Sequence, residues 1–169
     1  MKVIGIVAHD EHMGIGKDGK LPWYEPEDLK RFAKLTRHQT VLMGRRTWDS
    51  LPKKPLPSRI NIVCSRYAEH LVLPKSVRRF EDAKEAIISL KSEAPTDILW
   101  VIGGAEIYRT TMRYWDELYV TKIPRVHDCD TFFPPYEKDF RKVYDESGIY
   151  KVYKRHNFTF SNLDSDFNF

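Results

Sequence analysis

Asp28 is the acidic residue with the clearest potential for chemistry. Pro26, Glu27 and Asp28 favour the start of a helix, because proline and acidic residues suit a first turn. On that helix Asp28 shares one stripe with Phe32 and Leu35, and no basic residue is expected on the same face. A buried carboxylate is costly without a partner, which a cationic or donor-rich ligand would supply. The alternative is an acid that faces water and complements the helix dipole, and spacing alone does not decide between the two.

Three segments carry residue types that bind phosphate, and each directly follows a predicted strand. They are Gly44-Arg45-Arg46-Thr47, Ser65-Arg66 and Gly103-Gly104-Ala105. Helix N-termini expose amides that bind phosphate, glycine permits close approach, and arginine adds planar donors. In an open parallel sheet, ligands bind at the carboxyl ends of the strands. Each segment alone is compatible with an ordinary turn, but together they predict a phosphorylated cofactor, and the arginines favour NADP over NAD.

Residues 14–19 match the pattern G-x-G-x-x-G, but their context argues against a dinucleotide-binding fingerprint. Such a fingerprint opens a helix directly after a strand. Here the polar residues 9–12 come before the glycines, and Leu21-Pro22-Trp23 follows them. We therefore interpret the segment as a mobile loop that closes over a ligand. An ordinary surface turn is the alternative.

Arg59 also has two interpretations that spacing does not separate. It precedes a predicted strand and follows Leu56-Pro57-Ser58. The first interpretation is a solvated surface charge. The second is a clamp for a ligand carboxylate, with Leu51 and Leu56 as an apolar wall.

The remaining reactive residues predict neither a metal site nor a hydrolase. The six histidines have no ligand spacing on a helix, and the sequence has no G-x-S-x-G motif. Cys64 and Cys129 lie outside any metal-binding motif, although a disulfide between them stays open. Few cysteines and no secretory signal favour the cytoplasm, and no apolar run is long enough to span a membrane.

The net charge of +4 suits an anionic ligand or a nucleic acid. The basic runs, Lys53-Lys54 and Arg78-Arg79, are short and are interpreted as solvated surface charge. The sequence therefore does not favour a nucleic-acid partner.

Short apolar runs that alternate with helical patterns predict the elements behind these residues. The expected strands cover residues 3–8, 41–43, 60–64, 98–102 and 118–121, and residues 150–160 are also rich in strand formers. The expected helices begin near Pro26 and cover residues 47–51, 83–90 (capped by Asp82) and 105–112. This alternation predicts an α/β fold with a mostly parallel sheet. The 169 residues suit one domain.

The order and spacing of these motifs resemble the dihydrofolate reductase family, in its bacterial or phage form, over residues 1 to about 160. The matching segments are 6–8, 13–16, 21–23, 28–29 with Phe32, 43–48, 56–59, 101–105 with Tyr108, 118–121 and 130–134. The resemblance implies a single domain (1–160). It also implies a central eight-stranded, mostly parallel sheet, an antiparallel C-terminal strand and four flanking helices. Residues 161–169 are expected to be a flexible tail. Cys129 departs from the family pattern, in which a small residue is common, and this puts the mobility of its loop in doubt.

The resemblance implies reduction of 7,8-dihydrofolate to tetrahydrofolate, with Asp28, Leu21 and Trp23 as the catalytic residues. The implied substrate residues are Ile6, Ala8, Asp28, Leu29, Phe32, Leu51, Lys54, Leu56, Arg59, Ile102, Tyr108 and Thr121. Asp28 would bond the pterin, with Thr121 as its support. Arg59, assisted by Lys54, would grip the glutamate carboxylate of the substrate.

The resemblance also implies NADPH as the cofactor. Nicotinamide would lie among Ala8, Gly14, Ile15, Gly16, Lys17, Asp18, Gly19 and Lys20. The 2′-phosphate and adenosine would lie among Gly44, Arg45, Arg46, Thr47, Ser65 and Arg66. The pyrophosphate end would lie among Ile102, Gly103, Gly104, Ala105, Glu106, Ile107 and Tyr108, with a cis peptide bond between the two glycines.

Two alternatives remain beside this interpretation. One is a pyrimidine reductase of riboflavin synthesis, which shares the fold but would lack Asp28 matched with Trp23 and Arg59. The other is a pterin- or nucleotide-binding protein without turnover. The expected partners are dihydrofolate and antifolate inhibitors, with no membrane, no metal and a monomeric chain.

Overall fold

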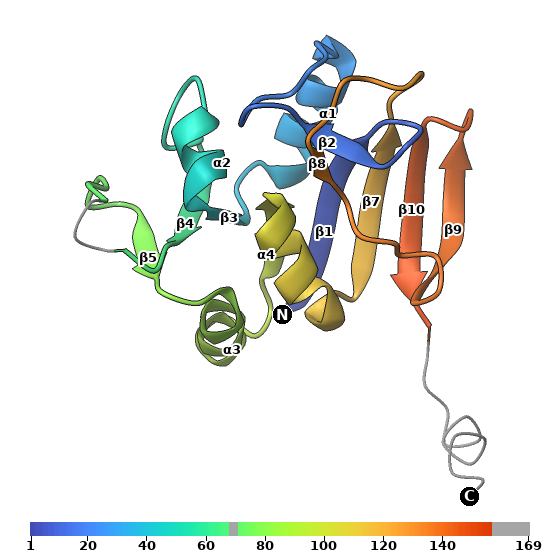
Figure 1. Cartoon of the computed structure of the whole chain (residues 1–169). Coiled ribbons are helices and arrows are strands. Elements are labelled where there is room, and N and C mark those ends of the chain that lie inside the picture. Colours follow the sequence, from blue (N-terminus) through green and yellow to red (C-terminus); the bar gives the residue numbers. More distant parts are fainter. Residues whose placement is uncertain (68–70, 157–169) are drawn as a thin grey trace, which may run out of the picture.

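A twisted sheet of eight strands forms the centre of the computed structural model, which describes residues 1–67 and 71–156 (Figure 1). From one edge to the other the strands are β5 (Arg78–Phe80), β4 (Ile60–Cys64), β3 (Thr40–Gly44), β6 (Ile98–Gly103), β1 (Lys2–His9), β7 (Glu117–Lys122), β10 (Tyr150–Arg155) and β9 (Phe140–Glu146). Neighbours from β5 to β7 are parallel, whereas β10 is antiparallel to both of its neighbours. The predicted sheet is confirmed, and the last strands extend it on the β7 side.

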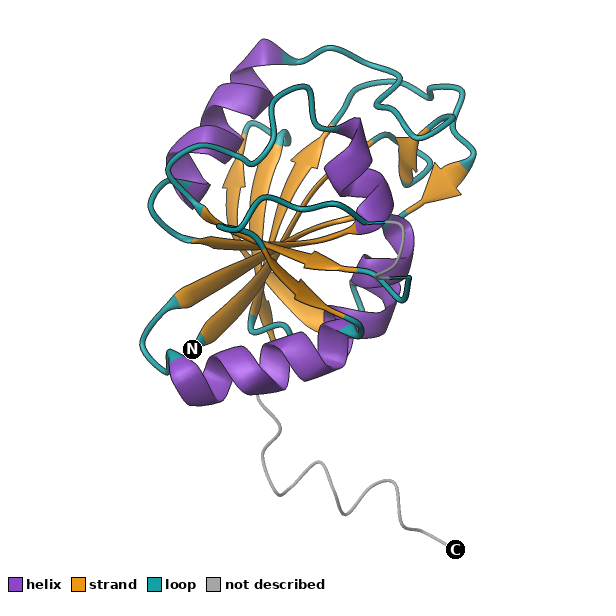
Figure 2. Cartoon of the chain, turned by 90° about the vertical axis from the view of Figure 1, so that its left-hand side faces the viewer, coloured by secondary structure: helices purple, strands orange, loops and turns teal. Residues whose placement is uncertain are grey.

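Helices cover both faces of the sheet, as the side view in Figure 2 shows. One core cluster joins the strands to α3 (Ala83–Glu93) and α4 (Ala105–Thr111), which runs into a short 3₁₀ helix (Met112–Tyr114). The other cluster lies toward α1 (Pro26–Thr36) and α2 (Arg45–Ser50). Val3 and Ile4, neighbours in β1, enter opposite clusters. Because both faces are buried, the central strands have to be continuously apolar, which is the pattern that predicted them.

The two central strands β1 and β6 separate toward their carboxyl ends. Their parallel pairing runs from Lys2↔Ile98 to Gly5↔Val101 and ends there. Strand β1 continues beside β7 as far as His9↔Lys122, so only its β6 side is released. In doubly wound sheets, ligands bind where neighbouring strands lead to opposite faces. This separation is therefore where a ligand site is expected.

A two-stranded ribbon lies outside the main sheet and was not predicted. Strand β2 (Gly14–Gly16) pairs antiparallel with β8 (Thr131–Phe132). A tight hairpin follows β2, in which the backbones of Lys17 and Lys20 exchange hydrogen bonds of 2.8 and 2.9 Å. Asp18 and Gly19 at its tip have φ values of 50° and 76°, which a two-residue primed turn requires. No helix opens at residues 14–19, which confirms that the glycines are not a dinucleotide-binding fingerprint.

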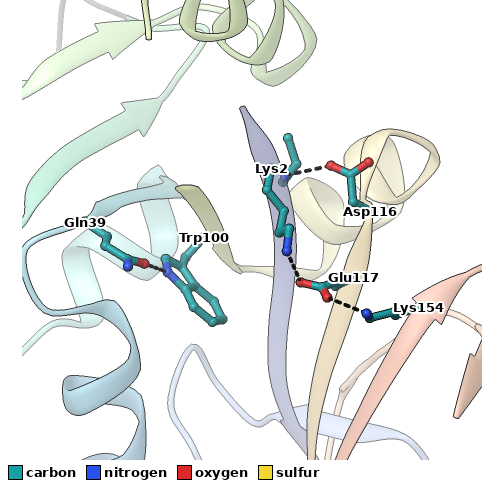
Figure 3. Close-up of polar contacts among 7 residues, drawn as sticks. Lys2, Gln39, Trp100, Asp116, Glu117 and Lys154 are labelled. Carbon is teal, nitrogen blue, oxygen red and sulfur yellow. Dashed lines mark hydrogen bonds and ion pairs between the residues drawn. The ribbon is translucent and has the colours of Figure 1, made fainter. Parts of the chain in front are cut away.

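The amino-terminal half of the sheet is held by polar side-chain contacts (Figure 3). The indole Nε1 of Trp100 donates to Oε1 of Gln39, just before β3. Glu117 is buried and accepts ion pairs from Lys2 at 3.4 Å and from Lys154 at 3.9 Å. These contacts join β1, β7 and β10 at the end where β1 and β7 begin. The carboxyl ends of the parallel strands, at the opposite edge, are free of these contacts and can form a ligand site.

The elements differ from the sequence prediction in several places. Helix α2 begins at Arg45, two residues earlier than expected, and β5, β8 and β9 were not predicted. Cys64 and Cys129 are both free thiols, so the disulfide left open is absent. The expected tail, 161–169, lies outside the described residues. Among the described residues, no helix combines the length and apolar character needed to cross a membrane.

Candidate active site

The Asp28 carboxylate turns toward the sheet, where the Thr121 hydroxyl of β7 donates a hydrogen bond of 2.5 Å to its Oδ1. Asp28 is half-buried, so the interpretation as a water-facing acid is wrong. Burial raises the pKa of this carboxyl; the bond from Thr121 and the Arg31 charge oppose the rise, and Glu25 adds to it. The result is a partly desolvated acid whose second oxygen accepts no hydrogen bond from the described residues.

Arg31 corrects one prediction, because a basic residue of α1 does act on Asp28. The Arg31 guanidinium lies 4.1 Å from the centroid of the Tyr150 ring in β10. Sequence patterns do not indicate this pair, because Arg31 and Tyr150 are far apart in the chain and meet only through the pairing of β10 with β7.

Apolar side chains line the region beside the separated strands. Ile6 of β1 and Ile102 of β6 pack partly buried against the core cluster on the α1 side. Leu51 and Leu56, which follow α2, pack against the same cluster. Leu51 and Leu56, predicted as an apolar wall beside Arg59, thus pack against the same core cluster as Ile6 and Ile102.

Tyr108 bridges the two strands where their pairing has ended. Its hydroxyl lies 2.7 Å from the carbonyl oxygen of Ile6 and 2.9 Å from that of Ile102. The phenol is buried, and burial raises its pKa. Tyr108 therefore stays neutral, and its one O–H is shared between the carbonyl groups of Ile6 and Ile102.

Arg59 lies against the far end of α1. Its Nε donates to the Pro57 carbonyl at 2.9 Å, and its Nη1 donates to the Thr36 hydroxyl at 3.2 Å. The guanidinium also lies 5.8 Å from the centroid of the Phe32 ring. Burial and the Arg37 charge lower the pKa of Arg59. Within residues 1–67 and 71–156, the Arg59 guanidinium forms no ion pair with a carboxylate. These contacts favour the clamp over the surface charge.

Two other predicted substrate residues, Leu29 and Lys54, contribute less directly to this region. Leu29 leaves 49% of its surface exposed and points less deeply inward than Phe32. The Lys54 ammonium donates to the carbonyl groups of Trp48 and Asp49, at 3.3 and 3.2 Å. Lys54 is thus engaged at the end of α2.

The starts of α2 and α4 lie side by side at the carboxyl edge of the sheet. Gly44 and Gly104 are their N-cap residues, and neither helix has a side-chain cap. A Cβ on Gly44 would lie 2.9 Å from Ile107, and one on Gly104 would lie 3.5 Å from the Thr47 hydroxyl. The Gly103–Gly104 peptide bond is cis, as the resemblance implied. The glycines therefore let the two helix starts pack closely together, and helix starts of this kind suit an anionic group.

Arginines surround the ends of β3 and β4. Arg45 pairs with Asp49 at 3.7 Å, and Arg66 pairs with Glu106 at 3.0 Å. Arg79 was not predicted, and its Nη1 donates to the Ser65 carbonyl at 2.8 Å. The signal for Arg79 was weak, because β5 is a three-residue edge strand in which charged side chains are ordinary.

Asp10 is a second acid that the sequence prediction missed. It is 1% exposed, and its Oδ1 accepts the backbone N–H groups of His12 and Gly14 at 2.9 and 2.8 Å. Its Oδ2 accepts the N–H of His127 at 2.8 Å. Burial alone would raise the pKa of Asp10, but these three backbone donors outweigh it and lower the pKa. Asp10 joins the base of the glycine-rich loop to the segment before β8.

The glycine-rich loop is joined to that segment at further points. Asp130 accepts the N–H of Asp18 at 3.0 Å through its carboxylate and donates its own N–H to the Gly16 carbonyl at 2.9 Å. After the hairpin, Leu21 is 54% exposed, and the Trp23 ring meets His127 edge-on at 5.2 Å between centroids. The other positions predicted for the cofactor differ in burial: Ala8, Ile15, Gly16 and Lys17 are half-buried, Gly14 is buried, and Asp18, Gly19 and Lys20 are exposed.

No cluster of three or more histidine, cysteine or acidic side chains suited to a metal ion occurs within the described part of the chain.

The fold and the site define a doubly wound α/β protein, with a half-buried carboxylate and two uncapped helix starts at one edge of the sheet. The family model for dihydrofolate reductase matches residues 2–165, and the chain therefore belongs to the dihydrofolate reductase family.

Individual relatives agree with this assignment. Dihydrofolate reductase from Drosophila melanogaster is 35% identical over 175 residues, which cover 89% of this chain and 96% of the relative. The protein of the same name from Mycobacterium leprae is 41% identical over 140 residues, which cover 80% and 82%. A solved structure of dihydrofolate reductase from Enterococcus faecalis, complexed with NADP(H) and RAB-propyl, has a TM-score of 0.79 and 29% identity. It covers 92% of this chain and 97% of its own.

Proposed function

We propose that this protein uses NADPH to reduce 7,8-dihydrofolate to 5,6,7,8-tetrahydrofolate, the reaction of its family. The observation that carries this proposal is the position of Asp28. A carboxylate that is partly removed from water lies beside the separated strands β1 and β6, at the same edge as the two glycine-rich helix starts. A flat ring bound to Asp28 can therefore reach a nucleotide held at those helix starts.

Asp28 recognises the pterin through paired hydrogen bonds. The pterin ring presents a 2-amino group and an adjacent ring nitrogen, and a carboxylate can accept two parallel N–H groups. Thr121 holds one oxygen and fixes the plane of the group, which reduces the ordering needed when the ligand binds. Ile6, Leu51, Leu56 and Ile102 supply the apolar surface around the ring.

Arg59 binds the glutamate end of the substrate. Its backbone and Thr36 contacts hold the guanidinium beside Phe32, at the opposite end of α1 from Asp28. A planar guanidinium matches a carboxylate with two donors. Leu29 and Phe32 contact the benzoyl portion between the two charged ends.

NADPH fits the second half of the site. The uncapped starts of α2 and α4 and the missing side chains at Gly44 and Gly104 suit phosphate groups. The 2′-phosphate would be held by Arg45, Arg46, Thr47, Ser65 and Arg66, and the pyrophosphate by residues 102–108. Arg79 joins the 2′-phosphate group through its position beside Ser65. When bound, NADPH supplies the hydride from C4 of its nicotinamide.

The protein contributes placement, charge and control of water. In the reaction a hydride would be added at C6 of the pterin and a proton at N5. Holding two rings in reactive contact can contribute about 7–11 kcal/mol to lowering the barrier. Asp28 polarises the pterin from the far side of the ring and favours its protonated form, but it does not touch N5. Water admitted beneath Leu21, and positioned by Trp23, delivers the proton.

One assay tests this function directly. Purified protein is mixed with dihydrofolate and either NADPH or NADH, and the loss of nicotinamide absorbance is followed. We expect rapid turnover with NADPH and much slower turnover with NADH. If dihydrofolate and NADPH bind with no turnover, the protein is a binding protein. If dihydrofolate does not bind, the assignment of Asp28 to a pterin is wrong.

The chain is further proposed to act as a monomer in the cytoplasm. The free thiols of Cys64 and Cys129 are compatible with a reducing compartment. Light scattering of the purified chain tests the monomer, since one chain has a mass of 20.0 kDa.

A further inference from the structure

We propose that Arg31 is a positioning residue that keeps Asp28 in its charged form for the pterin, and that Tyr150 holds the Arg31 guanidinium in place. The inference rests on the proposed function, in which Asp28 binds the pterin. It adds a residue from α1 and one from β10, neither of which touches the substrate.

The four residues form a closed path across three elements. Thr121 of β7 donates to Asp28 of α1 at 2.5 Å. Tyr150 of β10 is the register partner of Thr121 in the antiparallel pairing of the two strands. The Arg31 guanidinium lies 4.1 Å from the centroid of the Tyr150 ring, which leads the path back to α1. Asp28 and Arg31 are three residues apart on this helix and therefore lie on neighbouring positions of its surface.

Arg31 is the cation among the described groups that act on Asp28. The helix also contributes Glu25 at its N-cap, whose charge opposes that of Arg31. Strand β7 contributes the neutral Thr121 hydroxyl, and β10 contributes the Tyr150 phenol. The Tyr108 phenol lies within reach from α4 and stays neutral because it is buried and near the Asp28 charge.

The charges on this path affect one another in a consistent direction. Burial is the largest influence on Asp28 and raises its pKa, while the Thr121 bond and then Arg31 lower it. For Tyr150, burial and then the Asp28 charge raise the pKa, and Arg31 lowers it. These directions agree with the geometry, in which the Arg31 guanidinium lies 4.1 Å from the centroid of the Tyr150 ring and Tyr150 is the register partner of Thr121.

Separation of the charges is the useful feature of this arrangement. Among the described residues Arg31 and Asp28 form no ion pair, which would require a nitrogen and an oxygen within 4.0 Å. A direct ion pair would occupy the carboxylate oxygen that the pterin needs. A cation–π contact with the Tyr150 ring instead holds the Arg31 guanidinium in place. Its charge can then favour ionised Asp28 without blocking it.

The test measures the charge state of Asp28 itself. The side-chain carboxyl carbons of aspartate are labelled with ¹³C and titrated by NMR without ligand, and the Asp28 signal is identified by its loss in Asp28→Asn. We expect Arg31→Gln to raise the Asp28 midpoint by about 0.5 pH unit or more, because a nearby opposite charge favours the ionised form. The pH profile of kcat should move in the same direction.

Four further variants separate charge from packing. Arg31→Lys keeps the charge and should shift the midpoint by less than half as much as Arg31→Gln. Tyr150→Phe should match the wild type, whereas Tyr150→Leu should give an intermediate shift. Lys30→Gln is the matched control, because it removes a charge from the same helix turn at an exposed side chain and should leave the midpoint unchanged.

An unchanged midpoint in folded Arg31→Gln overturns the proposal, and so does an equal shift in Lys30→Gln. If Arg31→Gln does not fold, Tyr150→Leu decides: an unchanged midpoint then overturns the proposal, and a raised one supports it. The proposed function fails separately, because full activity of Asp28→Asn would reject it whatever the titrations show.

Discussion

At the scale of single residues, the site combines a carboxylate whose burial costs free energy with neighbouring groups that offset part of this cost. Asp28 loses part of its hydration, and one bond from Thr121 and the charge of Arg31 compensate only in part. Such a carboxylate lowers stability while it provides binding, a common trade at functional sites. Its neighbours Tyr108 and Thr121 remain neutral, so the charge at the site depends on one acid.

Replacing Asp28 by Asn should separate activity from stability. We expect turnover at neutral pH to fall by a factor of about 10²–10⁴, the range for a positioned acid–base group. The folded pKa is raised above the unfolded one, so the penalty from Asp28 grows as pH rises through these values and is full at neutral pH. The Asn variant should therefore melt slightly higher at pH 7, and the difference should vanish below about pH 3. Calorimetry across pH checks this, and a lower melting temperature at pH 7 would contradict it.

The arginines near β3 and β4 should discriminate between cofactors. We expect Arg45→Ala or Arg66→Ala to weaken NADPH by about tenfold or more, because each removes a charged phosphate partner, and to change NADH little. The ion pairs of these arginines with Asp49 and Glu106 are exposed, so their loss should hardly affect stability. Dissociation constants for both cofactors provide the measurement. Equal losses for NADPH and NADH would mean that the 2′-phosphate site is misplaced.

At the scale of elements, the sequence predicted those whose signal comes from burial. The strands β1, β3, β4, β6 and β7 are apolar because helices cover both their faces, and α3 shows its Asp82 cap plainly. Strands β2, β5 and β8 have two or three residues each, too few for a periodic pattern. Strand β9 has one buried residue, Phe140, followed by six exposed ones, and such an edge strand leaves almost no apolar signal.

The same contrast applies to the site. Asp28 and the phosphate segments were predictable because each belongs to a motif within a few residues. Asp10, Arg31 and Arg79 act on partners that are remote in the chain, namely His127, Tyr150 and the carbonyl of Ser65. Their roles depend on strand order and register, which the sequence pattern did not provide.

Asp10 should be an anchor for the loop elements. Asp10→Ala leaves three backbone N–H groups, one buried and two partly buried, without their acceptor, and we expect a loss of about 2–4 kcal/mol in the free energy of unfolding. Asp128→Ala is the control, since the side chain of Asp128 is 87% exposed and should contribute little. Chemical denaturation measures both.

The effect of Asp10 should also depend on pH. Its folded pKa is lowered, so its contribution is complete above the ordinary carboxyl range and is lost as pH falls through the folded value. The stability difference between the wild type and Asp10→Asn should therefore shrink below about pH 4. A difference that stayed constant in acid would argue against a charged anchor.

Gly14 should tolerate no side chain while Cys129 faces it. A Cβ on Gly14 would lie 2.5 Å from the Cys129 sulfur, so Gly14→Ala should displace β2 from its position and weaken both stability and NADPH binding. Gly16→Ala is the matched control, because its nearest contact would be an ordinary 3.5 Å. Pairing Gly14→Ala with Cys129→Gly should restore part of the loss. The absence of such coupling in the double-mutant cycle would disprove the contact.

At the scale of the whole molecule, one indole joins the parts of the fold that flank the site. Trp115 is fully buried, its Nε1 donates to the Thr111 hydroxyl at 3.1 Å, and its ring contacts Tyr108, Phe133 and Phe140. The ring also lies directly over Gly5 of β1. Helix α4, the central strand and the C-terminal strands therefore share one side chain.

Gly5→Ala should test this packing. The added methyl carbon would lie 2.4 Å from the Trp115 ring, and overpacking of this kind costs about 1–3 kcal/mol, with the upper end expected here. In a protein of this size that corresponds to a fall of roughly 5–10 °C in melting temperature. Adding Trp115→Phe, which has a smaller ring, should recover part of the loss. An unaltered melting temperature for Gly5→Ala would show that the indole does not lie over the strand.

Tyr108 lies between β1 and β6, at the point where their pairing has ended. Its phenol joins the two strands through hydrogen bonds, so the width of the opening is set before any ligand binds. Binding of a flat ring there requires no free energy to separate the strands. The opening should therefore select ligands by the thickness of their ring as well as by their charge.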